Sequence, residues 1–298
     1  MVCFHPIEAY QCSDGKIYFS DYKSSGGLGH VRQLSCGKCI GCRLEQSRQW
    51  AVRCVHEASL YQYNCMITLT YSDEHLPEEG TLVYKHFQDF MKRLRNLHKR
   101  KSWGKSDHFL PIRYYMSGEY GDRLGRPHFH VCLFNFDFSD RKYWRKSPAG
   151  SNLWRSETLE QLWSFGFSSI GELNFDSAAY AARYIMKKVT GDQAKAHYGT
   201  KVPEFCHMSL KPGIGAGWYE KWKADVYPHD YIVVNARKMK PPRYYDKLYQ
   251  REEPFEFDYL KNNRHWQAVE YQEDNTPERL QIKETVAQAK LKQLKRVL

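Results

Sequence analysis

The segment His128-Phe129-His130, with the apolar run Val131–Phe134 after it, constrains the fold of this 298-residue chain most strongly. The apolar run predicts a β-strand over 128–136. Because side chains alternate across a strand, His128 and His130 project from one face while Phe129 points into the core. Two neighbouring imidazoles can share one metal ion. With 13 histidines in the chain, chance alone produces roughly 0.6 such pairs, so the pair needs support from other residues.

A carboxylate close to the histidines in the sequence supports a metal site. Glu119 lies nine residues before His128, and the residues between them include Gly121, Gly125 and Pro127, which are typical of a turn. A hairpin here would bring Glu119 close to both histidines and supply the oxygen ligand that Mg²⁺ or Mn²⁺ prefers. Asp122 is the alternative ligand. The competing interpretation of Glu119 is a solvated carboxylate beside neighbouring arginines.

Tyr180 and Tyr184 lie four residues apart in an alanine-rich segment. A helix is expected there, capped by Asp176 or Ser177 and running to Val189. Residues four apart share one helix face, so both hydroxyls can point into one site. Aromatic side chains at this spacing also pack in ordinary cores, which is the competing interpretation.

Three cations near the tyrosines, Arg183, Lys187 and Lys188, suit a phosphate group. A tyrosine hydroxyl has an ordinary pKa near 10, so a nucleophilic tyrosine needs a base or a metal-polarised substrate at neutral pH. This segment therefore predicts a helix that carries phosphate chemistry.

The order of elements predicts an α+β fold with a central antiparallel sheet flanked by helices, mostly on one face. Its main domain is expected over 61–240, between a Cys-rich segment with a helix at 1–60 and a basic helical extension at 241–298. The expected elements are a helix over 43–62, a strand over 66–71, a helix over 84–101, strands over 111–118 and 128–136, a loop over 137–155, a helix over 158–163, a strand over 165–173, the tyrosine helix, a strand over 231–235 and a helix from Thr276.

The cysteines predict a reducing environment and a candidate zinc site. Their number, nine, is odd, and Cys36, Cys39 and Cys42 are spaced like metal ligands. A structural zinc site takes four ligands. Cys3 is the preferred fourth, and its competitors are Cys12, Cys54 and His56. Free thiols or an iron–sulfur cluster remain as alternatives.

The net charge of +11 and pI of about 9.1 favour a polyanionic partner, above all nucleic acid. Rings and cations alternate over 141–146, where Lys142, Arg145 and Lys146 flank Trp144, a composition suited to single-stranded DNA. The cations at 237–243 form a second such group. Solvated loops are the alternative for both. The N-terminus lacks the features of a signal peptide, and no run of 18 apolar residues predicts a membrane span.

In combination, these segments resemble the HUH endonuclease superfamily, in which two histidines flank a hydrophobic residue. More narrowly, the chain is similar to the replication initiators of the gokushovirus branch of the microviruses. The resemblance covers about 30–240. It is carried by four segments, Cys36–Arg43, the strand Ile67-Thr-Leu-Thr-Tyr71, Gly118–Phe134 and Ala178–Lys188.

The resemblance implies metal ligation by His128 and His130, with a third ligand, here Glu119, that varies across the superfamily. It also implies that Tyr180, Tyr184 or both attack DNA, and that Lys187 orients the phosphate. The enzyme would nick single-stranded or origin DNA, leave a 5′-phosphotyrosine and a free 3′-OH, and later rejoin the strand.

The resemblance implies a site of action in the host cell cytoplasm, with a host polymerase extending the 3′-OH. No GxxxxGK[ST] segment is present, so unwinding would need a host helicase. The alternatives are another HUH enzyme (a plasmid initiator, relaxase or transposase) or a non-catalytic nucleic-acid-binding protein with structural histidines and tyrosines. Covalent capture of DNA would exclude the non-catalytic alternative.

Overall fold

The computed structural model of the chain describes residues 3–12, 16–19, 30–102, 110–122, 124–183 and 188–293. The chain forms two compact units, one of Ser47–Glu252 and one of Met1–Gln46 with Glu253–Leu294. Helix α1 (Ile40–Ala58) begins in the second of these and ends in the first. The three-part division expected from the sequence stays a prediction.

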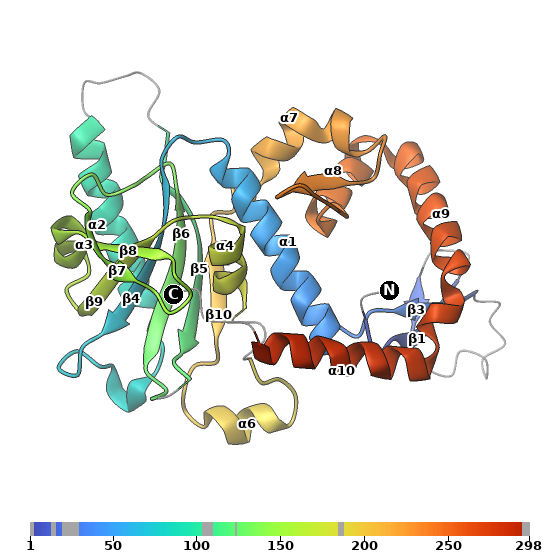
Figure 1. Ribbon diagram of the computed structural model, residues 1–298, viewed down its shortest axis with the longest axis horizontal. Helices are drawn as coiled ribbons and strands as arrows, with labels where there is room; N and C mark the ends of the chain where they lie inside the picture. Colours follow the sequence, from blue (N-terminus) through green and yellow to red (C-terminus); the bar gives the residue numbers. More distant parts are fainter. Residues whose placement is uncertain are drawn as a thin grey trace. The chain divides into compact units, whose positions relative to one another are not determined.

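Within the described part of the larger unit, seven strands form one antiparallel sheet in the order β10-β5-β6-β4-β9-β8-β7 (Figure 1). This arrangement confirms the predicted α+β fold with a central antiparallel sheet. The strands are β4 (Asn64–Tyr71), β5 (Arg113–Tyr120), β6 (Pro127–Phe134), β7 (Lys142–Lys146), β8 (Asn152–Arg155), β9 (Gly166–Gly171) and β10 (Phe205–Met208).

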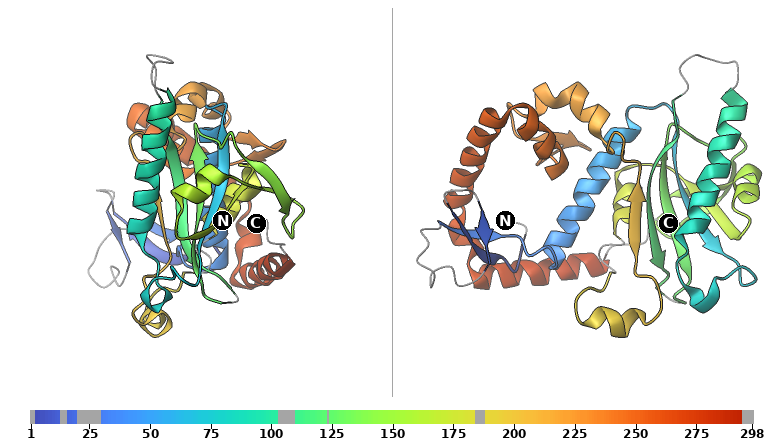
Figure 2. Two further views of the ribbon diagram at one scale, coloured as in Figure 1. Left: turned by 90° about the vertical axis from the view of Figure 1, so that its left-hand side faces the viewer. Right: turned by 180° about the vertical axis from the view of Figure 1, so that it is seen from behind.

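Helices cover both faces of this sheet, so the expectation that they lie mostly on one face is wrong (Figures 1 and 2). On one face Phe129, Val131 and Leu133 of β6 share a core with α2 (Tyr84–Ser102) and α3 (Glu157–Leu162). On the other, Cys132 and Phe134 share a second core with α1 and α4 (Phe175–Ala182). The second face is therefore apolar at one end of β6 and carries the two histidines at the other.

The expected loop over 137–155 is wrong, because β7 and β8 form a hairpin there. All five residues of β7 are exposed, so this edge strand lacks the apolar alternation by which strands are recognised. Tyr143 pairs with Trp154 and Arg145 with Leu153, which leaves Trp144 as the extra residue of a β-bulge.

The limits of the tyrosine helix also differ from the prediction. The cap of α4 is Asn174, whose side chain accepts a hydrogen bond from the Ser177 amide in a capping box. The helix ends at Ala182, before the expected end at Val189. Val189 is not helical, and its amide donates to the Tyr198 hydroxyl at 2.8 Å.

The remaining elements agree with the sequence where it made a prediction. The strand expected over 231–235 is β11, and the helix expected from Thr276 is α10, which begins at Pro277. No helix in the described ranges is long and apolar enough to cross a membrane. The other elements are β1 (Ile7–Gln11), β2 (Ile17–Tyr18), β3 (His30–Leu34), α6 (Gln193–Tyr198), α7 (Ala216–Val226), β11 (Ile232–Val234), β12 (Arg237–Met239), α8 (Arg243–Glu252), α9 (Pro254–Glu270) and α10 (Pro277–Gln293).

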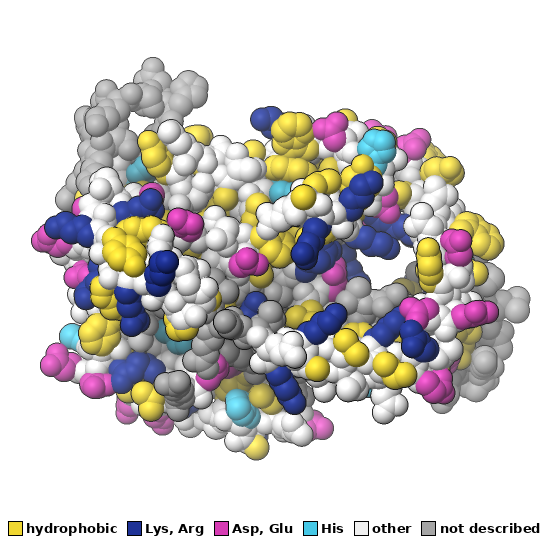
Figure 3. Space-filling view, viewed as in Figure 1, with side chains coloured by type: hydrophobic (Ala, Val, Ile, Leu, Met, Phe, Trp, Pro, Cys, Tyr) yellow, Lys and Arg dark blue, Asp and Glu magenta, His cyan; other side chains and the backbone are white. Residues whose placement is uncertain are grey.

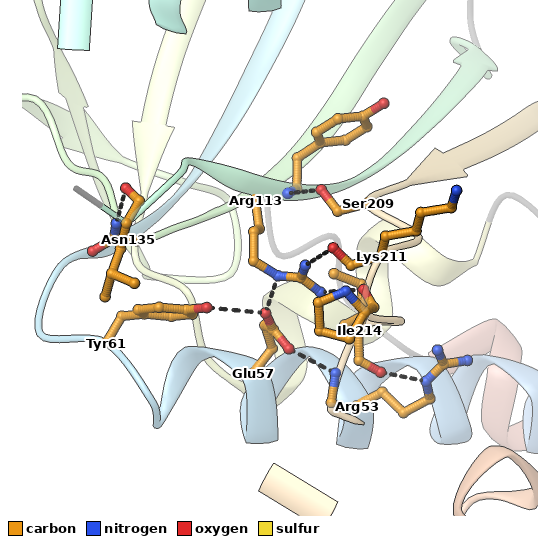
Figure 4. Close-up of polar contacts among 12 residues, drawn as sticks. Arg53, Glu57, Tyr61, Arg113, Asn135, Ser209, Lys211 and Ile214 are labelled. Carbon is orange, nitrogen blue, oxygen red and sulfur yellow. Dashed lines mark hydrogen bonds and ion pairs between the residues drawn. The ribbon is translucent and has the colours of Figure 1, made fainter. Parts of the chain in front are cut away.

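A buried ion pair fastens α1 to the sheet and to the chain after β10 (Figure 4). The Arg113 guanidinium on β5 donates to the Glu57 carboxylate on α1, and both residues are buried. The second Glu57 oxygen accepts from the Gly215 amide at 2.7 Å, and Arg113 also donates to the Pro212 carbonyl at 2.7 Å. Because both charges are hydrogen-bonded on several sides, this network selects one packing arrangement of α1 on the sheet.

We expect Arg113→Met to lower the free energy of unfolding by about 3–5 kcal/mol, because it leaves the buried Glu57 carboxylate without its counter-charge. Urea unfolding followed by circular dichroism measures the change. The matched control is Lys85→Met, which removes an exposed ion pair with Asp89 on α2 and should cost less than about 1 kcal/mol. Equal losses for the two variants would contradict the role given to the buried pair.

Candidate active site

The β5–β6 hairpin brings together the three residues expected to bind a metal. Its antiparallel register pairs Glu119 with His128 and Ser117 with His130, which places these side chains on one face of the sheet. His130 Nε2 lies 2.9 Å and His128 Nε2 3.6 Å from Glu119 Oε1. One ligand atom from each residue lies within 4.8 Å of the others, so the three can hold one ion.

The Glu119 carboxylate is suited to binding a cation despite its burial. Only 2% of its surface is exposed. Burial alone favours the protonated form, but the contacts with His128 and His130 outweigh it and hold the pKa of Glu119 well below its ordinary value. The carboxylate is therefore ionised at neutral pH, as a metal ligand must be.

The neighbours of the histidine rings orient them toward Glu119. His128 Nδ1 lies 3.1 Å from the Arg126 carbonyl, which can only accept a hydrogen bond, so Nδ1 carries the proton and Nε2 is left as a ligand atom. His130 Nδ1 is hydrogen-bonded to the Thr68 hydroxyl at 3.0 Å. Such contacts to the second ring nitrogen are typical of metal-binding histidines. Thr68 was not predicted from the sequence, although its strand alternates threonines with apolar residues.

Helix α4 brings Tyr180 next to His130. The two ring centroids are 5.0 Å apart and the rings meet edge to face at 81°. This approach is possible because the helix packs on the sheet through small side chains, those of Ala178, Ala181 and Ala182, which are fully buried. The Arg183 guanidinium lies 5.8 Å from the Tyr180 ring centroid and is the nearest predicted cation described at this helix.

Two of the predicted residues, Tyr184 and Lys187, lie outside the described residues, so the tyrosine pair stays a prediction. Lys188 is half-buried just after them. Asp122, the alternative metal ligand, is exposed and is not part of the three-residue group, although it lines the adjoining pocket.

A pocket of about 320 Å³ joins these residues to the β7–β8 hairpin. His128, His130 and Tyr180 line it together with Trp144 and Arg145 of β7. The predicted DNA-binding residues Lys142 and Lys146 are exposed on the same strand. The other lining residues are Thr68, Thr70, Gly121, Asp122, Leu153, Phe167, Ser168 and Ser169.

In the smaller unit, the structure brings the Cys3 sulfur to those of Cys36, Cys39 and Cys42, all within 4.8 Å of one another. Backbone amides point at these sulfurs, with Cys39 N–H donating to Cys36 Sγ at 3.3 Å and Phe4 N–H donating to Cys39 Sγ at 3.4 Å. Burial raises the pKa of Cys39, but hydrogen bonds from the Cys42 and Phe4 amides outweigh it and lower the pKa to about 6. The group can hold a metal ion.

The competing ligands do not belong to this group. Cys12 lies outside it, and Cys54 is buried in the second core of the larger unit. The His56 ring stacks on Trp218, with 3.5 Å between ring centroids, and its Nδ1 is hydrogen-bonded to the Tyr245 hydroxyl at 3.0 Å. Burial lowers the pKa of His56 to about 3, so this histidine is a neutral core residue at pH 7.

Comparisons with known proteins give one consistent family. The model of the ORF2-type family of replication-associated proteins matches residues 64–189. Replication-associated protein ORF2 of Spiroplasma virus 4 is 34% identical over 89% of this chain and 86% of its own length. Replication-associated protein VP4 of Bdellovibrio phage phiMH2K is 35% identical over 85% of this chain and 79% of its own.

This chain belongs to the microvirus replication-associated proteins. A further member, replication-associated protein ORF4 of Chlamydia phage 1, is 29% identical over 78% of this chain and 59% of its own length. No solved structure matches the chain. The family match includes β4, β5, β6, β9 and α4, and therefore the Glu119, His128 and His130 group together with Tyr180.

For this replication-associated protein we expect His56 to weaken the fold in acid. Its pKa is 6.5 when unfolded and about 3 when folded, so protons bind preferentially to the unfolded chain as the pH falls from about 6.5 toward 3. His56→Phe keeps the stacked ring but removes this titration, so its unfolding free energy should fall less steeply, by up to about 1.4 kcal/mol per pH unit. Urea unfolding at pH 7, 6, 5 and 4 measures both slopes, and parallel curves would contradict the assignment.

Proposed function

We propose that this replication-associated protein initiates rolling-circle DNA replication by nicking single-stranded origin DNA through a 5′-phosphotyrosine and later rejoining the strand. One observation carries the proposal. The Glu119, His128 and His130 ligand atoms lie within 4.8 Å of one another, and Tyr180 lies against His130 in the same pocket. A divalent-ion site beside a tyrosine hydroxyl suits phosphodiester cleavage without a nucleotide cofactor.

The donor set at Glu119, His128 and His130 fits Mg²⁺ or Mn²⁺. It combines a carboxylate oxygen with two imidazole nitrogens, includes no sulfur, and opens into a pocket that leaves room for a phosphate. When bound, the ion supplies Lewis-acid polarisation of the scissile phosphate. The Arg126 carbonyl and the Thr68 hydroxyl keep both Nε2 atoms directed at that position.

The chain's own residues would carry the strand transfer. The Tyr180 oxygen attacks phosphorus, the P–O3′ bond breaks, and the tyrosine proton is lost as the 3′ oxygen leaves and becomes a 3′-OH. Arg183, beside the Tyr180 ring, counters the negative charge that develops on the phosphate. The phosphotyrosine ester retains the bond energy, so the reverse attack by a 3′-OH rejoins the strand.

Completion of a replication round needs a second nucleophile. Tyr184, with Lys187 beside it in the sequence, is the predicted second tyrosine, which would cut the regenerated origin while the released 3′-OH closes the first strand. The free 3′-OH would be extended by a host polymerase and the duplex opened by a host helicase, in the host cell cytoplasm. Lys142, Lys146 and Lys188 would contact the DNA backbone.

The test is capture of a covalent adduct. Purified protein is incubated with labelled single-stranded DNA tiled across its own genome, with and without Mn²⁺, and resolved on a denaturing gel. We expect an Mn²⁺-dependent adduct that His130→Ala reduces by at least about 100-fold, the scale for positioned catalytic groups. Tyr180→Phe, Tyr184→Phe and the double variant identify the nucleophile, with the adduct lost completely only in the double variant. The control is Tyr63→Phe, an exposed tyrosine outside the pocket.

Two results would count against the proposal. An adduct that persists in the double tyrosine variant would place the nucleophile elsewhere. No adduct on any tiled fragment, with Mn²⁺ bound and the protein folded, would leave a DNA-binding protein in which Glu119, His128 and His130 have a structural role.

We also propose that the four-cysteine group binds Zn²⁺. A tetrahedral site with Zn–S bonds of about 2.3 Å has sulfur–sulfur edges of about 3.8 Å. The Cys36–Cys42 and Cys39–Cys3 sulfur distances are 4.0 and 3.9 Å, close to that geometry. A four-iron cluster would need its ligand sulfurs much farther apart, so the spacing favours a single ion.

We expect the purified chain to contain about one zinc per molecule by inductively coupled plasma mass spectrometry, because four thiolates make a closed structural site. Cys42→Ser should lower both the zinc content and the thermal unfolding midpoint. Cys206→Ser, a half-buried cysteine outside the group, should change neither. Iron in place of zinc, or full zinc retention by Cys42→Ser, would contradict the assignment.

A further inference from the structure

A row of side chains crosses the sheet from the metal-binding group to an exposed aromatic ring. The register pairs Glu119 with His128, His128 with Thr70, and Thr70 with Phe167, so all four share one sheet face. Phe167 therefore lies two strand spacings, roughly 10 Å, from His128. Its side chain lines the same pocket and is 64% exposed, a costly position for an apolar ring within a sheet.

A second exposed ring reaches the pocket because of the bulge in β7. Trp144 is the extra residue of that bulge, and both it and its neighbour Arg145 line the pocket. In a regular strand two consecutive side chains would point to opposite faces. The Arg145 guanidinium lies 4.1 Å and that of Arg155 5.6 Å from the Trp144 ring centroid, so cations border the ring.

The charge around these rings suits a nucleic-acid strand and does not suit an apolar partner. Lys142 and Lys146 are exposed on the same strand as Trp144. Figure 3 shows hydrophobic side chains interleaved with Lys and Arg on the part of this face where Figure 1 places β7 and β8. Aromatic rings bordered by cations are the usual means of holding unpaired bases, which stack on rings while cations contact phosphates.

We propose that Phe167 and Trp144 form a base-stacking platform that holds one or two unpaired DNA bases next to the metal-binding group. The proposal deepens the nickase function and rests on it. A base paired within a duplex cannot reach such rings, so the platform selects single-stranded DNA. Because the stacked base is held two strand spacings from His128, the platform sets which phosphate lies over Glu119, His128 and His130.

Binding of an abasic series tests the platform without relying on cleavage. The tightest-binding single-stranded fragment is synthesised with one nucleotide at a time lacking its base, and binding is measured by fluorescence anisotropy in EDTA. We expect wild type to lose about 5- to 150-fold in affinity at one or two adjacent abasic positions and little elsewhere. Phe167→Ala and Trp144→Ala should weaken binding to the intact strand by a similar factor and flatten the series, because the stacking partner is already missing.

Two control variants separate stacking from charge and from general damage. Lys142→Gln should weaken all strands about equally and reduce the salt dependence of binding, while keeping the dip at the abasic positions. Trp266→Ala removes an exposed tryptophan from the smaller unit and should leave the series unchanged. Circular dichroism establishes that each variant is folded, which is expected because both platform rings are substantially exposed.

The failures of the two proposals are distinguishable when the Mn²⁺ adduct assay is run on the same variants. An adduct together with a flat abasic series in wild type would overturn the platform and keep the nickase. A dip removed by Phe167→Ala, with no adduct, would support the platform and overturn the nickase. Equal affinity for single-stranded and duplex DNA, or a dip that survives both ring substitutions, would also overturn the platform.

Discussion

The antiparallel register between β5 and β6 is the constraint on which the candidate site depends. It pairs Glu119 with His128, residues only nine positions apart in the chain, and so assembles all three candidate metal ligands from one hairpin. A slip of one residue would turn the ligands of one strand to the opposite face. The register is held because Phe129, Val131 and Leu133 must face the α2 core, and burying these side chains disfavours any slipped alternative.

The parts of the structure predicted well from sequence are those with strong local patterns. The strand at β6 and its turn were recognisable from apolar alternation and glycines, and these sufficed to place Glu119 beside the histidines. Cys3 could be chosen as the fourth cysteine only by elimination, since a segment of more than 30 residues separates it from Cys36 and spacing carries no information at that range. The resemblance to microvirus initiators supplied the roles of the residues.

The parts missed depend on contacts that sequence patterns do not encode. Strand β7 has no buried residue, so only its pairing with β8 makes it a strand. Helix α4 ends at Ala182, and beyond it Tyr198 takes the amide hydrogen of Val189. Phe167 looked like an ordinary strand residue, and its place in the row from Glu119 to Thr70 follows only from strand order. Likewise, the buried Glu57–Arg113 pair joins elements with no sequence signal to connect them.

The bulge at Trp144 makes the rim of the pocket adjustable independently of its chemical centre. Before the bulge β7 side chains follow one parity and after it the other, so Tyr143 pairs with Trp154 while Arg145 pairs with Leu153 across from the pocket. Because β7 is an edge strand that pairs only with β8 among the described strands, gain or loss of one residue there would reverse which side chains reach the pocket without shifting β5 or β6. Relatives can thus diverge in the DNA they prefer through length changes at this edge.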